Sequence, residues 1–265
     1  MLFVLVLSAR ARGEVDCHNG PADDAQRNAA SLTALPWSPF GRPEFGWQTY
    51  VPMVTREIGS ACPAVSPGFA LALSRWRVAQ GLGAAGVIDP PAFMRLKQIW
   101  DARRPFVRTS RIACPPPPPF ALLAMVRPGE AWRGKVVWLR ASALTAYRAM
   151  VATARAQVPA IARDPEMLTI FSGYRDPDSD ARRCAVEGNC QRIVRAACSS
   201  HRTGQAMDLF LGAAPGHRPD SSDDINRLFQ SRTPAYQWLV ANGGRFGFAN
   251  YVFEPWHWEW SSDSQ

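Results

Sequence analysis

Five consecutive prolines, Pro115 to Pro119, restrict the possible folds of this chain more than any other feature. Proline fixes φ and has no amide hydrogen to donate, so such a run fits neither a helix interior nor a central strand. It instead adopts the extended polyproline II conformation and forms a short, stiff spacer. Because 265 residues are enough for two modest domains, we expect a linker at residues 114–119 with a domain on either side.

The part before the prolines is predicted to contain an irregular lead-in and a small helical domain. Residues 12–44 are rich in proline, glycine, alanine and polar side chains, so residues 1–44 are expected to have little regular structure. In residues 45–113, apolar side chains recur at helical spacing in two stretches, the second with Asp89 as its N-cap. These apolar positions are Phe69, Leu73, Trp76, Phe93, Leu96 and Trp100.

Part of this helical region has a sequence pattern of its own. It consists of Trp76 to Leu82, Gly86 to Asp89 and a following helix that carries Leu96. The pattern resembles the small helical peptidoglycan-binding module found beside many cell-wall hydrolases. The resemblance implies that this domain tethers the chain to wall polymer and so raises the local substrate concentration. The alternative is a generic helical hairpin that packs on the second domain.

Cysteine usage and the N-terminus both favour export. Leu2 to Leu7 is an apolar run, and Ala9-Arg10-Ala11 matches the small-x-small pattern before a signal cleavage site. The run is too short to span a membrane, and no membrane span is expected elsewhere. An even number of widely spaced cysteines predicts disulfides, and hence a periplasmic or extracellular location, with buried free thiols as the alternative. The cysteines are at positions 17, 62, 114, 184, 190 and 198, and six allow 15 pairings.

The net charge of +8 favours an anionic partner or surface. Nucleic acid is not the expected partner, because the arginines are scattered and no basic run is interleaved with aromatic residues. An anionic cell wall fits the same charge. The sequence says nothing about the oligomeric state.

The second domain, residues 120–265, is predicted to have an α+β fold: a small antiparallel sheet with flanking helices. Helices and strands alternate too loosely for a doubly wound sheet. The expected helices are at residues 142–155 and from 234 to about 243, and the expected strands at 167–171, 206–211 and 251–260.

Two of the four histidines, His201 and His257, lie in segments that indicate a metal site on this sheet. Asp208 follows His201 within the apolar stretch Ala206 to Leu211, where a carboxylate is costly to bury unless its charge is compensated. Two imidazoles and one carboxylate are a suitable ligand set for catalytic zinc, which keeps a fourth position for water. His18 and His217 lie in polar surroundings and are expected at the surface.

Three motifs in this domain occur in a recognisable order. They are Ser172-Gly173-Tyr174-Arg175, then S-x-H-x-x-G-x-A-x-D from Ser199 to Asp208, then Glu254-Pro255-Trp256-His257. Over roughly residues 165–260 they resemble the D-alanyl-D-alanine metallopeptidases. That family shares a superfamily with lysostaphin-type endopeptidases and the hedgehog signalling domain.

The resemblance implies a role for each matching residue. His201, Asp208 and His257 would bind Zn²⁺, and Glu254 would be the general base. Arg175 would neutralise charge in the transition state or bind the substrate's carboxylate. The remaining motif residues implied to contact substrate are Ser172, Tyr174 and Ser199. One departure concerns a glutamine that relatives carry a few residues after S-G-Y-R, because after Arg175 this chain has no glutamine until Gln191.

The role of Glu254 depends on the backbone around Pro255. In a regular strand, His257 and Glu259 share one face and Glu254 points to the other. Glu254 therefore reaches the metal only if the chain bends there, and Pro255 can break the strand pairing. The alternative base is Glu259, which otherwise would orient a metal ligand.

The predicted function is zinc-dependent hydrolysis of peptide bonds in peptidoglycan stem peptides, as a D,D-carboxypeptidase that removes a terminal D-alanine. A peptidoglycan endopeptidase and an L,D-carboxypeptidase would use the same zinc site. A wall-binding protein without catalysis is the alternative from another class. A zinc peptidase of ordinary peptides is not supported, because no H-E-x-x-H helix is present.

Overall fold

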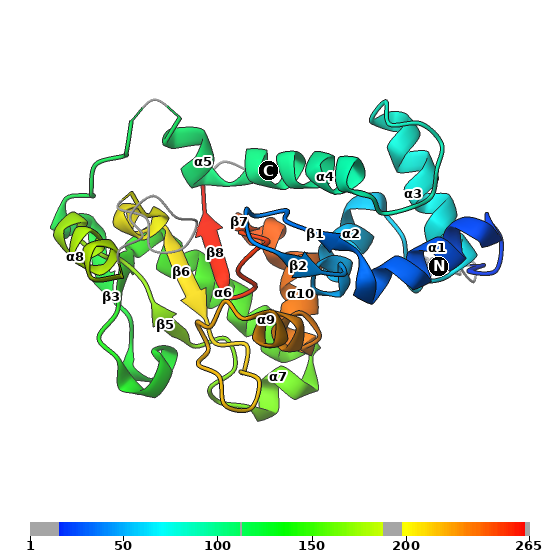
Figure 1. Cartoon of the computed structure of the whole chain (residues 1–265). Helices are drawn as coiled ribbons and strands as arrows, with labels where there is room; N and C mark the ends of the chain where they lie inside the picture. The colour runs from blue at the N-terminus through cyan, green and yellow to red at the C-terminus, as the bar shows by residue number, and fades with distance from the viewer. Residues whose placement is uncertain (1–15, 112, 188–197, 263–265) are drawn as a thin grey trace, which may run out of the picture.

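The structure is a computed structural model that describes residues 16–111, 113–187 and 198–262 (Figure 1). The expected signal segment, Cys190 and Gln191 lie outside the described residues. Among the described helices, none has the length and apolar character needed to cross a membrane.

A four-stranded antiparallel sheet lies at the centre of the second half of the chain (Figure 1). Its order is β5 (Ile170–Ser172), β6 (Ala206–Leu209), β8 (His257–Trp260), β7 (Phe248–Asn250). Two-stranded sheets are formed by β1 (Pro36–Trp37) with β2 (Glu44–Phe45), and by β3 (Leu123–Met125) with β4 (Trp138–Arg140). Together with the helices, these sheets confirm the predicted α+β class.

Helices of the second half surround this sheet. They are α6 (Ala141–Gln157), α7 (Pro159–Arg163), α8 (Pro177–Glu187), α9 (Asp224–Ser231) and α10 (Pro234–Asn242). The apolar face of α6, with Leu144, Tyr147 and Met150, shares one core with Trp256 and Trp258. Because side chains alternate along a strand, burying Trp258 in this core places His257 and Glu259 on the opposite face of β8.

The part of the chain before the proline run is the first half, and its described residues form five α-helices besides the short 3₁₀ helix η1 (Gln48–Tyr50). The α-helices are α1 (Ala22–Ala34), α2 (Val51–Ile58), α3 (Pro67–Ala79), α4 (Pro90–Arg103) and α5 (Pro105–Thr109). The two predicted helical stripes are α3 and α4. Asp89 caps α4 as expected, since its side chain accepts a hydrogen bond from the Ala92 N–H. The predicted apolar positions of both helices are buried in one core.

The expectation of an irregular lead-in at residues 1–44 is wrong for α1. The helix forms because alanine and other good helix formers fill residues 22–34, while proline and glycine lie outside it. It is held by its polar face: Asn28 bonds the Gly86 carbonyl and the Ile88 N–H, and Asp24 accepts from the Gly86 N–H. Averaging composition over the whole lead-in hid this local pattern.

The predicted last strand, 251–260, is also shorter than expected, because only His257–Trp260 forms β8. Residues 251–256 form a tight turn between β7 and β8, closed by hydrogen bonds from Glu254 N to Tyr251 O and from His257 N to Glu254 O. Asn250 fastens the turn from inside, since its amide donates to the carbonyls of Glu254 and His257. The bend that Glu254 requires is therefore present.

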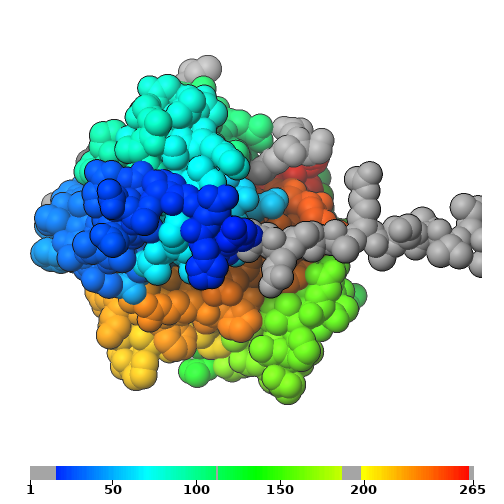
Figure 2. Space-filling model, turned by 90° about the vertical axis from the view of Figure 1, so that its right-hand side faces the viewer, coloured from blue at the N-terminus to red at the C-terminus, as the bar shows by residue number. Residues whose placement is uncertain are grey.

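The two halves pack directly against each other, as Figure 2 shows for the blue and cyan N-terminal residues beside the orange α9 and α10. Val252 and Phe253, from the turn before β8, belong to the core of the first half. Arg227 of α9 is fully buried there, donating to Phe253 O and to the hydroxyl of Tyr50. The division into two domains on either side of residues 114–119 stays a prediction.

Disulfides fasten both halves. Cys17 pairs with Cys62, and Cys114, at the start of the proline run, pairs with Cys198. Cys184 is also disulfide-bonded. The prediction of disulfides over free thiols is confirmed for these described cysteines. The Cys114–Cys198 bond holds the segment that leads into His201.

Candidate metal centre

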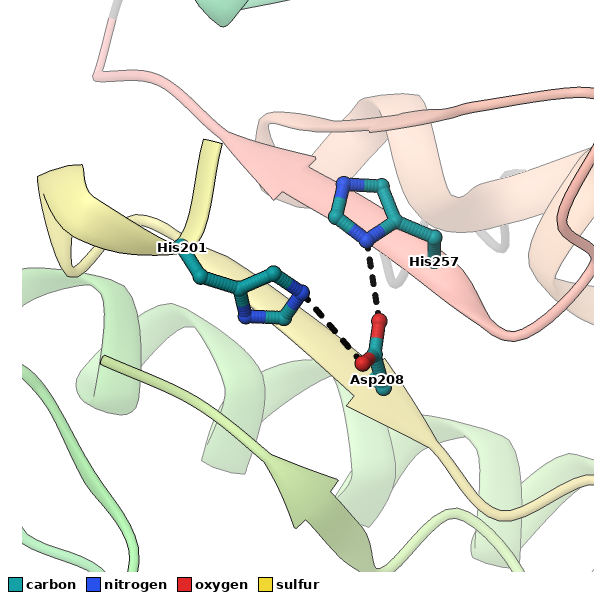
Figure 3. Close-up of side chains that lie close together, drawn as sticks. All are labelled: His201, Asp208 and His257. Atoms are coloured by element: carbon teal, nitrogen blue, oxygen red, sulfur yellow. Dashed lines mark hydrogen bonds and ion pairs between the residues drawn. The ribbon is translucent and has the colours of Figure 1, made fainter. Parts of the chain in front are cut away.

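His201, Asp208 and His257 meet on one face of the central sheet (Figure 3). Asp208 on β6 lies directly opposite His257 on β8 in the antiparallel register, so their side chains project side by side. His201 comes from the 3₁₀ helix η5 (Ser200–Thr203), which Ser199 caps and Gly204 ends in the left-handed conformation (φ 69°). This short helix and turn bring the imidazole back over β6.

The three ligand groups are buried and close together. His201 Nε2 lies 3.3 Å from one oxygen of Asp208, and His257 Nδ1 lies 2.9 Å from the other. The possible ligand atoms all lie within 4.8 Å of one another, and each side chain is less than 10% exposed. Asp208 is therefore shared between the two rings.

The partners of the other two ring nitrogens show which atoms face the centre. His201 Nδ1 lies 2.7 Å from the Gly173 carbonyl, which only accepts, so Nδ1 carries the hydrogen. His257 Nε2 lies 3.0 Å from Ser200 Oγ and 3.4 Å from a carboxylate oxygen of Glu259. In neutral rings, the nitrogens toward Asp208 are then both lone pairs.

Burial disfavours a charge on His257, but the carboxylates of Asp208 and Glu259 raise its pKa to about 9, so without an ion this ring carries a proton toward Asp208. With both rings neutral, the two lone pairs and the carboxylate would instead bind a cation. The nitrogen and oxygen donors suit Zn²⁺, and hydrogen bonds at the outer nitrogens are how proteins fix metal-binding imidazoles. Burial disfavours the charge of Asp208, but the two imidazoles beside it bring its pKa well below the usual range. Burial lowers the pKa of His201, so this ring is neutral and available as a ligand.

Glu259 lies behind His257 and is held by the first half of the chain. Arg104 donates from Nε (3.0 Å) and Nη2 (2.6 Å) to one carboxylate oxygen, and the Phe106 N–H donates to the other (3.0 Å). Burial disfavours the charge of Glu259, but the neighbouring Arg104 and His257 bring its pKa to about 2. Glu259 is therefore an ionised carboxylate that lies next to His257, on the side of the ring away from Asp208.

Glu254 lies on the turn before β8 and faces the same centre. One of its carboxylate oxygens is 4.0 Å from His257 Nδ1, the nitrogen that points to Asp208. Its side chain is 14% exposed and lines the cleft over the ligands. The two glutamates thus occupy different positions, Glu254 on the open side of the centre and Glu259 on the closed side.

The ligands lie at the floor of a cleft of about 340 Å³. Arg175 lines it and is held in place by hydrogen bonds to Asp180 (2.8 Å) and Ser172 (3.1 Å). Five basic side chains line the cleft against three acidic ones, of which Asp208 is committed to the imidazoles. The basic residues are Arg104, Lys135, Arg175, Arg183 and Arg218. Three of them are each paired with a carboxylate: Arg104 with Glu259, Arg175 with Asp180, and Arg218 with Asp220.

The other predicted site residues separate into two groups. Ser172 and Ser199 line the cleft, whereas Tyr174 is not among the lining residues. His18 is exposed, and His217 is half-buried against Pro215 and Asp223, so neither joins the metal centre.

Four side chains that line the cleft are not among the site residues predicted from the sequence: Arg104, Ser200, Lys135 and Arg218. Ser200 lies inside the S-x-H motif, so its position next to His201 was a usable signal. Arg104 is 155 residues from Glu259 along the chain, and no local pattern connects the two.

The comparisons with known proteins assign no family to this chain. No family model matches the sequence, and no curated protein matches it either. Among solved structures, the chain is similar to the LdcB LD-carboxypeptidase, a structure described as revealing the molecular basis of peptidoglycan recognition. The similarity covers 46% of this chain and 59% of that one, with 20% identity and a TM-score of 0.33. A likeness at this level does not establish a shared activity.

Proposed function

We propose that this chain is a zinc-dependent peptidase that acts on peptidoglycan stem peptides, with a terminal D-alanine as its preferred leaving group. The observation that carries the proposal is the pair of buried imidazole nitrogens that face the Asp208 carboxylate below an open cleft. Such a centre has the ligand set and spacing to hold a cation in place of a proton, and it leaves one side accessible to substrate.

His201, Asp208 and His257 would hold the zinc, which supplies Lewis-acid chemistry by polarising a carbonyl and acidifying water. Glu254 is positioned to take a proton from the attacking water and deliver it to the leaving amine. Glu259 is already bound by Arg104 and Phe106, so it is the weaker candidate for the base.

The substrate preference rests on Arg175 and the basic lining of the cleft. A guanidinium fixed by Asp180 and Ser172 can bind a carboxylate through two parallel hydrogen bonds without further ordering. A free C-terminal carboxylate next to the scissile bond suits it, which favours a carboxypeptidase over an enzyme that cuts internal cross-links. Export is proposed on the disulfides Cys17–Cys62 and Cys114–Cys198, which persist in oxidising compartments.

The test is digestion of purified muropeptides with and without a chelator, with products read by mass spectrometry. Loss of the fifth residue, the terminal D-alanine of a pentapeptide stem, abolished by the chelator and restored by zinc, is the expected result. Cleaved dimers would identify an endopeptidase, and cleavage after the third stem residue an L,D-carboxypeptidase. If no muropeptide is cleaved in a zinc-dependent way, the chain is no peptidoglycan peptidase, and a wall-binding role would be tested next by pull-down on sacculi.

A further inference from the structure

The end of α4 delivers a charged side chain from the first half of the chain to the metal centre. Arg104 precedes Pro105, and a residue before proline is confined to extended backbone, as its φ of −72° and ψ of 123° show. Helix α4 therefore ends at Arg103, and α5 begins beside the end of β8 (Figure 1). The Arg104 side chain is 12% exposed and points at Glu259.

Arg104 and Phe106 together account for both oxygens of Glu259. Two guanidinium N–H groups bind one oxygen, and the Phe106 backbone N–H binds the other. The carboxylate is 2% exposed, so it depends on these donors rather than on water. Its arginine-bound oxygen also lies 3.4 Å from His257 Nε2. Fixing Glu259 in this way keeps an acceptor next to that nitrogen.

We infer that Arg104 is a positioning residue of the metal centre, which holds Glu259 so that the His257 ring keeps Nδ1 directed at Asp208. This inference rests on the proposed zinc site. An acceptor at Nε2 selects the tautomer whose Nδ1 lone pair faces the ion, and it also fixes the ring plane. The guanidinium of Arg104 in addition lies 4.1 Å from the Tyr251 ring, at the start of the turn that carries Glu254.

The first half of the chain is therefore part of the metal centre, beyond any role in wall binding. An arginine suits the position because its planar fork directs two donors to one carboxylate and stacks on an aromatic ring at the same time. A lysine would keep the charge without this geometry.

The test compares zinc dissociation constants of full-length variants, measured by competition with a chromophoric chelator. Arg104→Met is expected to weaken zinc binding by about 10- to 100-fold, as is typical when the partner of a metal-binding imidazole is lost. Arg104→Lys should lie between this variant and the native chain. The matched control is Arg103→Met, because Arg103 is the preceding residue and binds Glu57 instead, so its zinc affinity should not change.

A second measurement separates positioning from a merely structural role. In Arg104→Met/Glu259→Gln no charged carboxylate is left buried without a partner, so its zinc affinity should be no lower than that of Arg104→Met alone. Additive losses would overturn the inference. Unfolding curves of the metal-free proteins show which variants fold. If Arg104→Met does not fold, unchanged zinc affinity in both Arg104→Lys and Glu259→Gln would overturn it.

The outcomes also distinguish this inference from the proposed function. If the native chain binds zinc and cleaves muropeptides while Arg104→Met binds zinc equally well, only the inference is wrong. If the native chain binds no zinc, both are wrong. Weaker zinc binding in Arg104→Met supports the inference even if the natural substrate proves to be another peptide.

Discussion

Glu254 and Glu259 are separated by five residues and approach His257 from opposite sides, so their substitutions should have different effects. Glu254→Gln is expected to lower kcat by about 10²- to 10⁴-fold, because a general base is lost, and to leave bound zinc unchanged. Glu259→Gln should weaken zinc binding instead. The measurements are muropeptide kinetics and zinc content by mass spectrometry. Loss of turnover with zinc retained in Glu259→Gln alone would make Glu259 the base.

Asp208 is the carboxylate that the two imidazoles share, and its replacement should affect the metal most directly. Asp208→Asn is expected to weaken zinc binding by at least about 100-fold, because a neutral amide cannot compensate a dication. Asp220→Asn is the matched control, since Asp220 lines the same cleft and accepts from Arg218. Titration with zinc followed by competition reads both. Equal zinc affinities in the two variants would place the metal elsewhere.

At the scale of secondary structure, the Cys114–Cys198 disulfide fixes the segment that leads into η5. Removing it with Cys114→Ser/Cys198→Ser should lower the free energy of unfolding by about 2–5 kcal/mol, because the bond closes a separation of 84 residues. The Cys17–Cys62 disulfide closes a separation of 45 residues. Removing it with Cys17→Ser/Cys62→Ser should lower the free energy of unfolding by a similar amount, since loop entropy grows slowly with length. Urea unfolding measures both losses.

Only the first pair should also disturb the metal centre, because Cys198 lines the cleft next to Ser199. Weaker zinc binding in Cys114→Ser/Cys198→Ser, with normal zinc binding in the other pair, is the expected result. Equal zinc affinities would mean that η5 keeps its position without the disulfide.

The contact between α6 and the short helix η3 (Pro128–Glu130) predicts a pH dependence of stability. Arg148 binds both oxygens of Glu130, at 2.7 and 2.9 Å, and this holds the pKa of Glu130 below its usual value. A depressed folded pKa stabilises the fold at pH above the unfolded value of about 4.3 and loses this effect as pH falls through the folded value.

Glu130→Gln should therefore lower the free energy of unfolding near pH 7, by at most about 1 kcal/mol because the pair is partly exposed. The difference from the native chain should shrink as pH falls below about 4.3 and vanish below the folded pKa of Glu130, where the carboxylate is neutral in both states. Urea unfolding at a series of pH values measures this. A difference that persists at low pH would mean that the carboxylate acts through packing and not through its charge.

Secondary structure with a strong local signal could be predicted from the sequence, and elements defined by distant contacts could not. Helix α4 could be predicted because its N-cap, Asp89, and its stripe of apolar residues are both signals within one short stretch of sequence. The proximity of His201 and Asp208 could be predicted because the two residues share one motif. The turn at 251–256 was misread as strand, because its aromatic residues have high β propensity while Asn250 imposes the bend through side-chain hydrogen bonds. Arg104 was missed because only the tertiary fold brings it to Glu259.

At the scale of the whole molecule, the two halves pack directly against each other, whereas the proline run predicts a stiff spacer between them. The turn that carries Glu254 packs against the first half. Phe40 contacts Phe253 (ring centroids 4.9 Å) and Tyr251 (6.2 Å). Arg227 of α9 also contacts this turn, with its guanidinium 4.1 Å from the Phe253 ring. The first half therefore contacts the turn that carries Glu254 as well as Glu259, which lies next to His257.

Phe40→Ala tests this coupling through packing alone. It removes a buried ring and should lower the free energy of unfolding by about 3–5 kcal/mol. It should also lower kcat with zinc retained, because the turn loses its aromatic contacts and Glu254 loses its fixed position. Phe69→Ala is the matched control, since Phe69 is equally buried in the same core but stacks on Trp47. Its stability loss should be similar and its kcat unchanged. Equal losses of kcat in both variants would show that the site responds to overall stability, and unchanged kcat in both would show that the turn keeps its shape without the first half.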